Sequence, residues 1–231
     1  MALRKLKLLS SMATRELLTV LAEEYRRTSG REVATEAAGG VDVAKRVEAG
    51  EAADVVVLSA NAIDKLIASG RLLAGSRSDL VKSGVSIAVR AGAPKPDMGS
   101  EEAVKRAVLA AKSVSFSTGP SGVYLEKLFE RWGILESIRA RIIVPRPGVP
   151  VGSLVASGEA ELGFQQLSEL MNLAGVAVVG PLPPAIQTVT VFSGGLCARS
   201  EDPAGARALL DYLASPVTAA FKQRYGMDSA R

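Results

Sequence analysis

Three short segments of the chain combine small polar residues with glycine where an extended stretch passes into a helical one. They lie at 6–14 (LKLLSSMAT), 33–41 (VATEAAGGV) and 114–123 (VSFSTGPSGV). Small side chains at these junctions leave the first backbone N–H groups of each helix uncovered, and those groups have no partner within the helix. Uncovered N–H groups and the positive end of the helix dipole together attract anions. The three segments therefore predict a protein that holds a small negatively charged molecule.

The composition excludes several kinds of chemistry. Histidine is absent and Cys197 is the single cysteine, which removes the usual zinc, haem and Cys/His catalytic sites and any disulfide within the chain. We therefore expect no cofactor and no metal. Cys197 lies in the apolar run 194–198, which predicts a buried small hydrophobic side chain. The net charge is only +4, and no basic block is interleaved with aromatic residues, so we expect no nucleic-acid partner.

The first ten residues are basic, as in an export signal, but the apolar run that follows is only Leu8-Leu9. An export signal needs an apolar run of about 7–15 residues, and no stretch is long enough to span a membrane. We expect a cytoplasmic protein as the sequence stands, or a periplasmic one if a leader was removed.

Apolar runs alternate with amphipathic stretches along the whole chain, which predicts an α/β protein with parallel strands and right-handed crossovers. The amphipathic stretch 13–29 predicts a first helix, and further helices begin near Val41, Asn61, Glu101, Ser121 and Pro203, with Pro216 starting the last one. Ser100 is expected to cap the helix that begins at Glu101. The expected strands are 5–9, 32–36, 54–58, 84–90, 113–117, 141–144, 161–165, 176–179 and 188–193.

Two extended stretches, near 82–86 and at 188–193, are expected to carry the chain into a second lobe and back. The helices after Ser200 have no long strand of their own to cover. We therefore expect them to pack on the first lobe.

Four motifs, in order along the chain, resemble those of molybdate-type periplasmic substrate-binding proteins. The most diagnostic is 50–60 (GEAADVVVLSA) with 64–70 (DKLIASG) after it. Ser10-Ser11 before a long helix resembles the first oxyanion loop of that family. The segment 158–166 (GEAELGFQQ) is similar to its late strand, and 215–221 (SPVTAAF) to its closing helix. The chain looks most like the solute-binding family 11 branch, some of whose relatives are aconitate isomerases.

This resemblance implies a bilobal type II periplasmic-binding-protein fold, in which two α/β lobes with mixed, mainly parallel sheets are joined by two crossing hinge strands. Lobe 1 would comprise 1–83 and 193–231, and lobe 2 would comprise 84–192, with hinge strands near 84–90 and 188–193. The resemblance places the ligand in the cleft between the lobes, at the carboxyl ends of the strands.

The chain departs from the molybdate-binding pattern at two positions. The loop that should offer a second serine contains Gly39 and Gly40, and the late tyrosine position falls near Gln165-Gln166. A tetrahedral oxyanion needs many donors that converge on one point, so these losses argue against molybdate. Adjacent glycines allow a close backbone approach, and glutamine both donates and accepts hydrogen bonds. A longer anion, such as a di- or tricarboxylate, fits better.

The candidate ligand-binding residues are those of the small-residue loops and of the late strand: Ser10, Ser11, Met12, Gly39, Gly40, Ser59, Thr118, Ser121, Gly122, Tyr124 and Gln165. Several have a purely structural alternative. Ser11, Ser59 and Ser121 can act as helix caps. Tyr124 can offer its hydroxyl to a ligand or serve as a packing residue. One of the two adjacent glutamines should line the site, since a buried amide needs partners.

Three functional hypotheses follow. The first is a binding protein that closes on a small anion. If exported, it would deliver the anion to the permease of an ABC transporter, and if cytoplasmic, it would sense or buffer a metabolite. The second is an isomerase that shifts a double bond in an unsaturated organic acid by proton transfer. No acidic residue clearly enters the three loops, so this hypothesis lacks an obvious base. The third, a ligand-responsive domain of a transcription regulator, has less support, because no basic recognition helix precedes Leu6.

Overall fold

The computed structural model describes residues 4–146 and 148–230, and these form two compact units. Unit 1 contains the chain up to Lys82 and again from Val191, and unit 2 contains Ser83–Thr190. Both boundaries lie within long strands, β4 (Ser78–Arg90) and β9 (Val189–Leu196). Each unit has its own sheet and its own hydrophobic core.

The sheet of unit 1 is built around β1 (Leu6–Ser11), which pairs in parallel with both β2 (Val33–Ala38) and β3 (Val55–Ser59). The second part of β9 adds an antiparallel strand beside β3. The short strand β10 (Asp228–Ser229) pairs with Val81 and Lys82 at the start of β4. Because β1, β2 and β3 are parallel, their carboxyl ends lie at one edge of the sheet.

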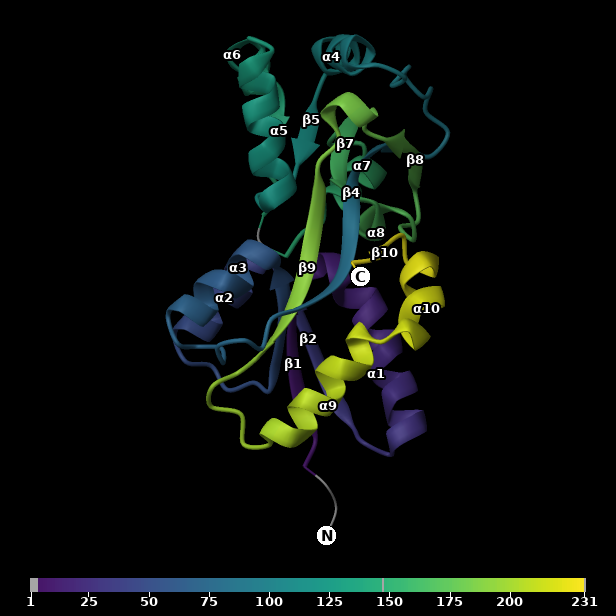
Figure 1. The fold of residues 1–231 in the computed structure, drawn as a ribbon. Helices are drawn as coiled ribbons and strands as arrows, with labels where there is room; N and C mark the ends of the chain where they lie inside the picture. The colour runs from purple at the N-terminus through teal and green to yellow at the C-terminus, as the bar shows by residue number, and fades with distance from the viewer. Residues whose placement is uncertain (1–3, 147, 231) are drawn as a thin grey trace. The chain divides into compact units, whose positions relative to one another are not determined.

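Helices cover both faces of this sheet because its strands are apolar on both sides. Leu6 and Leu8 of β1 face one core cluster with α1 and α9, while Leu9 faces a second cluster with α2 and α3. This alternation is the period of two that a strand imposes. Figure 1 shows α2 and α3 on one side of β1 and α9 on the other. The helical elements of this unit are η1 (Met12–Thr14), α1 (Arg15–Ser29), α2 (Gly40–Glu48), α3 (Ala60–Ala68), α9 (Pro203–Ala214), η4 (Pro216–Thr218) and α10 (Ala219–Arg224).

Unit 2 contains a second mixed sheet. In it, β5 (Val114–Phe116) pairs in parallel with β6 (Ile142–Ile143) and β7 (Leu162–Gln166). The second part of β4 is antiparallel to β7 and to β8 (Val176–Pro181). The helical elements of this unit are α4 (Glu101–Ala110), α5 (Pro120–Arg131), α6 (Leu135–Ile138), η2 (Arg139–Arg141), α7 (Val151–Ser157), α8 (Leu167–Leu170) and η3 (Pro184–Ile186).

The core of unit 2 centres on Phe129 and Phe164, whose ring centroids lie 6.2 Å apart in an edge-on arrangement. The only tryptophan of the chain, Trp132, packs at the margin of this core and donates from Nε1 to Glu101 over 2.6 Å. On the other face of β7, Gly163 lets α7 approach closely: a Cβ there would lie 2.4 Å from Cγ2 of Val155. The position of α7 therefore depends on the absence of a side chain at residue 163.

Several sequence predictions can be compared with these elements. The cap at Ser100 is confirmed, since its Oγ accepts from the N–H of Ala103 over 3.1 Å. The predicted cap at Ser121 is wrong: Gly119 is the cap residue and Ser121 lies inside α5. Pro120 occupies the first helical position, where its missing N–H costs no hydrogen bond within the helix. Pro216 starts η4 rather than an α-helix, and α10 follows it.

Residues 78–81 of β4 were not expected to be extended, because the predicted extended stretch began near Lys82 and the predicted strand at Gly84. The strand begins six residues before the predicted start at Gly84, from Ser78 to Ser83. The predicted burial of Cys197 is confirmed, and burial with the nearby Asp54 carboxylate raises the pKa of the thiol to about 12. Within residues 4–146 and 148–230, no helix is long and apolar enough to cross a bilayer.

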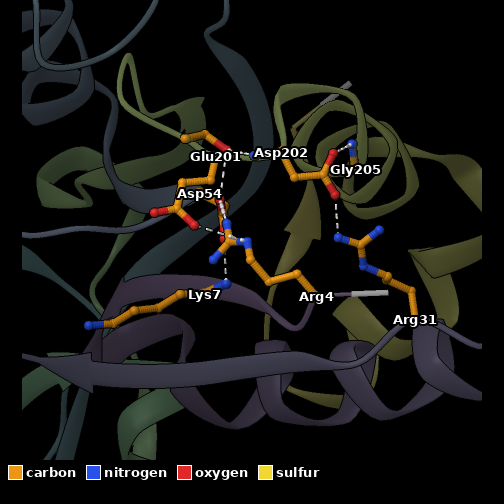
Figure 2. Close-up of polar contacts among 8 residues, drawn as sticks. Arg4, Lys7, Arg31, Asp54, Glu201, Asp202 and Gly205 are labelled. Atoms are coloured by element: carbon orange, nitrogen blue, oxygen red, sulfur yellow. Dashed lines mark hydrogen bonds and ion pairs between the residues drawn. The ribbon is translucent and has the colours of Figure 1, made fainter. Parts of the chain in front are cut away.

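A polar network at the amino end of β3 ties several segments of unit 1 together (Figure 2). Asp54 is buried and accepts hydrogen bonds from the backbone N–H of Lys7, over 2.8 Å, and from the Ser200 hydroxyl, over 2.6 Å. Arg4 also donates to this carboxylate. In the same network, Arg31 forms an ion pair with one carboxylate oxygen of Asp202. The other oxygen of Asp202 accepts a hydrogen bond from the N–H of Gly205 and so caps α9. Asp54 thus holds β1 and the start of the C-terminal segment against β3.

Replacing Asp54 by alanine should lower the free energy of unfolding by about 2–4 kcal/mol, because the Lys7 N–H and the Ser200 hydroxyl lose their acceptor. Denaturant unfolding followed by circular dichroism measures this change. The matched control is Glu201→Gln. Glu201 is 78% exposed and contacts the same Arg4, through an ion pair of 3.6 Å with Nε, so its loss should cost little. Equal losses in the two variants would contradict a structural role for Asp54.

Candidate functional site

The first group of candidate residues lies at the carboxyl edge of the unit 1 sheet. Ser11 ends β1 and pairs with Ala38, so the junction at Gly39–Gly40 lies beside it. Ser59 ends β3, the strand on the other side of β1. Three strand-to-helix junctions that are 48 residues apart at most (Ser11 to Ser59) thus occupy one edge of a parallel sheet. We call Ser11, Gly39, Gly40 and Ser59 the first loop set.

The helices α2 and α3, which follow two of these junctions, begin without a hydrogen bond from the side chain of the cap residue. Ser11, Gly39 and Ser59 are the cap residues of η1, α2 and α3, and none of them makes a side-chain cap hydrogen bond. In α2 the first intrahelical bond runs from the N–H of Val43 to the carbonyl of Gly39, over 2.9 Å. The N–H groups of Gly40, Val41 and Asp42 precede that bond. They are donors of the kind that receives an anion.

Gly40 and Ser11 lie close enough to contact a common ligand. A Cβ placed on Gly40 would lie 3.6 Å from the Cβ of Ser11, which is ordinary van der Waals contact. The Ser11 hydroxyl lies 3.4 Å from that of Thr14, and Thr14 donates to the Ser11 carbonyl over 3.2 Å. The hydroxyl of Thr14 therefore fixes the turn of η1 rather than capping α1. Asp42, in the first turn of α2, brings one carboxylate to this set.

The remaining candidates of unit 1 flank this set. Ser10 is almost fully buried, one residue before the end of β1, and Met12 begins η1 with its side chain half-buried. All six sequence-predicted residues of this unit therefore lie at or directly beside one sheet edge.

The second group of candidates lies at the carboxyl edge of the unit 2 sheet, where Phe116 at the end of β5 pairs with Phe164 near the end of β7. After β5 the chain turns into α5, and the hydroxyls of Ser117 and Ser121 lie 3.1 Å apart. Ser121 is buried, whereas Thr118 is exposed. The sequence analysis did not single out Ser117, although it belongs to the same small-residue segment.

Gln165, near the end of β7, connects two helices through its side-chain amide. Its Oε1 accepts from the N–H of Gly152 in the first turn of α7 over 3.3 Å, and its Nε2 donates to Oε1 of Glu169 over 2.8 Å. The amide is buried, and these contacts use one of its two N–H groups and one lone pair of its oxygen. We call Ser117, Ser121, Gly152, Gln165 and Glu169 the second loop set.

Glu169 is a functional candidate that the sequence analysis missed. It lies in α8, which begins directly after β7, and its side chain is only half-buried. A carboxylate at the carboxyl edge of a sheet can accept a proton from a bound molecule. The signal that could have found it is its place directly after the strand that carries Gln165. Glu169 is thus a second carboxylate beside a loop set, in addition to Asp42.

Gly122 and Tyr124 both have structural roles, in packing and in hydrogen bonding within unit 2. A Cβ on Gly122 would lie 1.4 Å from the carbonyl oxygen of Ser117, so only glycine fits this point of α5. The Tyr124 hydroxyl donates to the carbonyl of Ile186 over 2.8 Å, and its ring packs against the core of unit 2. Gln166, the other glutamine of the pair, lies 2.9 Å from the Thr190 hydroxyl through its amide. The two glutamines thus point to different neighbours.

Comparison with known proteins identifies related sequences. Residues 6–228 match the family model described as bacterial extracellular solute-binding protein. A curated protein from Pseudomonas sp, named aconitate isomerase, is 42% identical over 218 residues, which are 91% of this chain and 82% of that protein.

Two solved structures illustrate the similarity of fold. The periplasmic molybdate-binding protein of Azotobacter vinelandii superposes with a TM-score of 0.80 at 22% identity, over 96% of this chain and 98% of that one. The sulfate-binding protein SubI of Mycobacterium tuberculosis H37Rv also gives a TM-score of 0.80, at 14% identity, over 99% of this chain and 88% of that one. At these identities the likeness concerns the fold alone.

Proposed function

Because the chain belongs to the family of bacterial extracellular solute-binding proteins, we propose that it binds a small organic acid that carries two or three carboxylates. One observation carries the proposal. Two α-helices of unit 1, α2 and α3, begin at one sheet edge, and the cap residue of neither makes a side-chain cap hydrogen bond. These N–H groups are donors for negatively charged oxygen atoms.

The identity of the donors favours a carboxylate over a tetrahedral oxyanion. Gly39 and Gly40 provide backbone N–H groups and no hydroxyl, and Gln165 is already bonded to Gly152 and Glu169. The two positions at which a compact oxyanion would need further side-chain donors therefore supply fewer of them. A ligand whose carboxylates are spread over a carbon chain uses backbone donors at separate points, which suits these loops.

Thermal unfolding against a panel of anions tests this proposal. The panel contains molybdate, sulfate, phosphate and small mono-, di- and tricarboxylates, and a ligand that binds the folded state alone raises the melting temperature by mass action. We expect the largest increase with a di- or tricarboxylate. An increase with molybdate alone would contradict the argument from Gly39, Gly40 and Gln165.

Replacing Gly40 by valine should weaken the binding of the best carboxylate about tenfold or more, because the branched side chain would lie over Ser11 and the first N–H groups of α2. Isothermal titration calorimetry measures the affinity. Gly40→Ala is the graded control, since its single methyl makes only ordinary contacts, at 3.6 Å from the Cβ of Ser11. An unchanged affinity in Gly40→Val, with an unchanged melting temperature of the free protein, would place the ligand elsewhere.

A second function, isomerisation of an unsaturated tricarboxylate such as aconitate, is favoured by Glu169 and by the 42% identical Pseudomonas relative of that name. A base removes a proton from the methylene group beside the double bond. The electron pair then shifts along the carbon chain, and the proton returns to the former alkene carbon, so that no atom is gained or lost. Glu169 is the carboxylate for this step, and Gln165 holds it in place over 2.8 Å. Nuclear magnetic resonance detects the movement of the double bond directly.

The partner and the compartment stay predictions. Delivery of the ligand to the permease of an ABC transporter requires export, and a cytoplasmic isomerase requires none. Fractionation of cells that express the complete gene product, with detection by antibody, distinguishes the two locations.

A further inference from the structure

A cavity of about 130 Å³ lies in unit 1 at the edge of the sheet opposite to the first loop set. Its lining includes Ala53, just before β3 begins, and Cys197, just after β9 ends. Because β3 runs from this cavity to Ser59, the two places are separated by the length of the strand. A cavity needs a volume of about 10–15 Å³ to hold one water molecule. This cavity therefore has room for a small ion and some of its water molecules.

Two arginines, Arg71 and Arg199, line the cavity although they are 128 residues apart (199 − 71). A backbone bridge between Leu72 and Cys197 brings their segments together, and the N–H of Ala198 donates to the carbonyl of Arg71 over 2.9 Å. Arg199 lies beside Gly50, where a Cβ would be 3.9 Å from Nη1. The fold thus places two guanidinium groups at the same cavity.

The arginine donors at this cavity lack acceptors in the part of the chain that the structure describes. Nε of Arg71 is buried and has no hydrogen-bond partner there. A buried donor without an acceptor costs free energy, so Arg71 occupies this place at a cost to stability. A guanidinium presents its N–H groups as a planar fork that matches the oxygen atoms of phosphate or carboxylate.

The other polar groups of the lining do not neutralise these cations. Glu51 is held by Arg46, over 2.6 Å, and by Lys7, over 2.8 Å, and these hydrogen bonds lower the pKa of its carboxyl to about 2. Its charge is therefore already balanced. The Cys197 thiol, with its raised pKa, carries no charge at neutral pH. The carboxyl ends of α2 and α3 also lie here, and their partial negative charge favours the arginines and opposes an anion, so the two guanidinium groups together have to outweigh it.

From this arrangement we propose that Arg71 and Arg199 form a second anion site, which binds a phosphate-sized oxyanion independently of the proposed organic-acid site. The site goes beyond the proposed function, because it uses none of the residues of either loop set. The two guanidinium groups hold the anion between them, with Arg199 on the side of Gly50.

The test is calorimetric titration of the full chain with inorganic phosphate, followed by the same titration of the variants Arg71→Gln and Arg199→Gln. We expect each variant to weaken phosphate binding about tenfold or more, while the response to the best carboxylate remains unchanged. Arg207→Gln, an exposed arginine of α9, is the matched control and should bind phosphate like the parent protein. Competition with acetate and citrate distinguishes an inorganic anion from a small organic acid as the occupant.

The melting temperature without anion gives a second, independent readout. Arg71→Met removes the unpaired buried donor, so the free protein should be as stable as the parent or more stable, and phosphate should no longer raise its melting temperature. Phosphate binding that is absent, or unchanged in both arginine variants, would overturn the proposal. Loss of phosphate binding in Gly40→Val alone would also overturn it and would assign phosphate to the first loop set.

Discussion

Replacing Glu169 by glutamine should lower the rate of aconitate isomerisation by about 10²–10⁴-fold, which is the usual contribution of a general base. The amide keeps the shape of the carboxylate but cannot accept the proton from the substrate. Removing one negative charge from an anion site should leave substrate binding equal or tighter. We therefore expect a fall in kcat with KM unchanged or lower, measured by nuclear magnetic resonance of the reaction mixture.

Two further variants make this expectation specific. Glu126→Gln changes an exposed glutamate of α5 and should not alter kcat. Gln165→Met removes the hydrogen bond to Glu169, so it should lower kcat less than Glu169→Gln and shift the pH profile, as a positioning residue does. A Glu169→Gln protein that isomerises at the parental rate would exclude Glu169 as the base. A parent protein that binds tricarboxylates without converting them would contradict the isomerase function and support the binding function.

The second large effect is expected at Gly122. A methyl group there would lie 1.4 Å from the carbonyl oxygen and 2.6 Å from the carbonyl carbon of Ser117, and both are backbone atoms. The start of α5 must then move away from the end of β5. We expect Gly122→Ala to lower the free energy of unfolding by about 3 kcal/mol and to disturb the contact between Ser117 and Ser121.

Gly119→Ala is the matched control for Gly122→Ala, because both change a glycine to alanine in the same turn. A Cβ on Gly119 would lie 3.7 Å from the Ser117 hydroxyl, and its φ of −81° suits any residue. Denaturant unfolding of both variants measures the difference. Similar stabilities would contradict the packing role of Gly122 and leave ligand contact as the reason for a glycine at this position.

The fold class could be predicted from the sequence because most of its strands are apolar on both faces. The run Val55–Ser59 is buried almost throughout, and such runs between amphipathic stretches indicate α/β units. The polar first part of β4 gave no such signal, since its strand character depends on pairing with β10 at the far end of the chain. The strand β10 gave no signal in the sequence either, because it is only two residues long.

The candidate site was predictable where it depends on local chain geometry and not where it depends on distant contacts. The junctions at Ser11 and Gly39 could be expected to meet, because parallel strands that are neighbours end at one edge. The assignment of Ser121 as a cap was wrong, because Pro120 determined where α5 begins. Glu169 was missed because the four-residue α8 has no periodicity to detect. The cavity at Arg71 and Arg199 depends on one backbone bridge that no sequence pattern announces.

The placement of Trp132 and Cys197 has a practical consequence for every measurement described above. The only tryptophan belongs to unit 2 and the only cysteine to unit 1. Indole fluorescence therefore reports the opening of one unit. The Cys197 thiol is largely buried and its pKa is raised to about 12, so its reaction with an alkylating reagent is slow in the folded unit and becomes faster when that unit opens. The natural protein thus carries one intrinsic reporter in each half, and the stabilities of the halves can be followed separately without an added label.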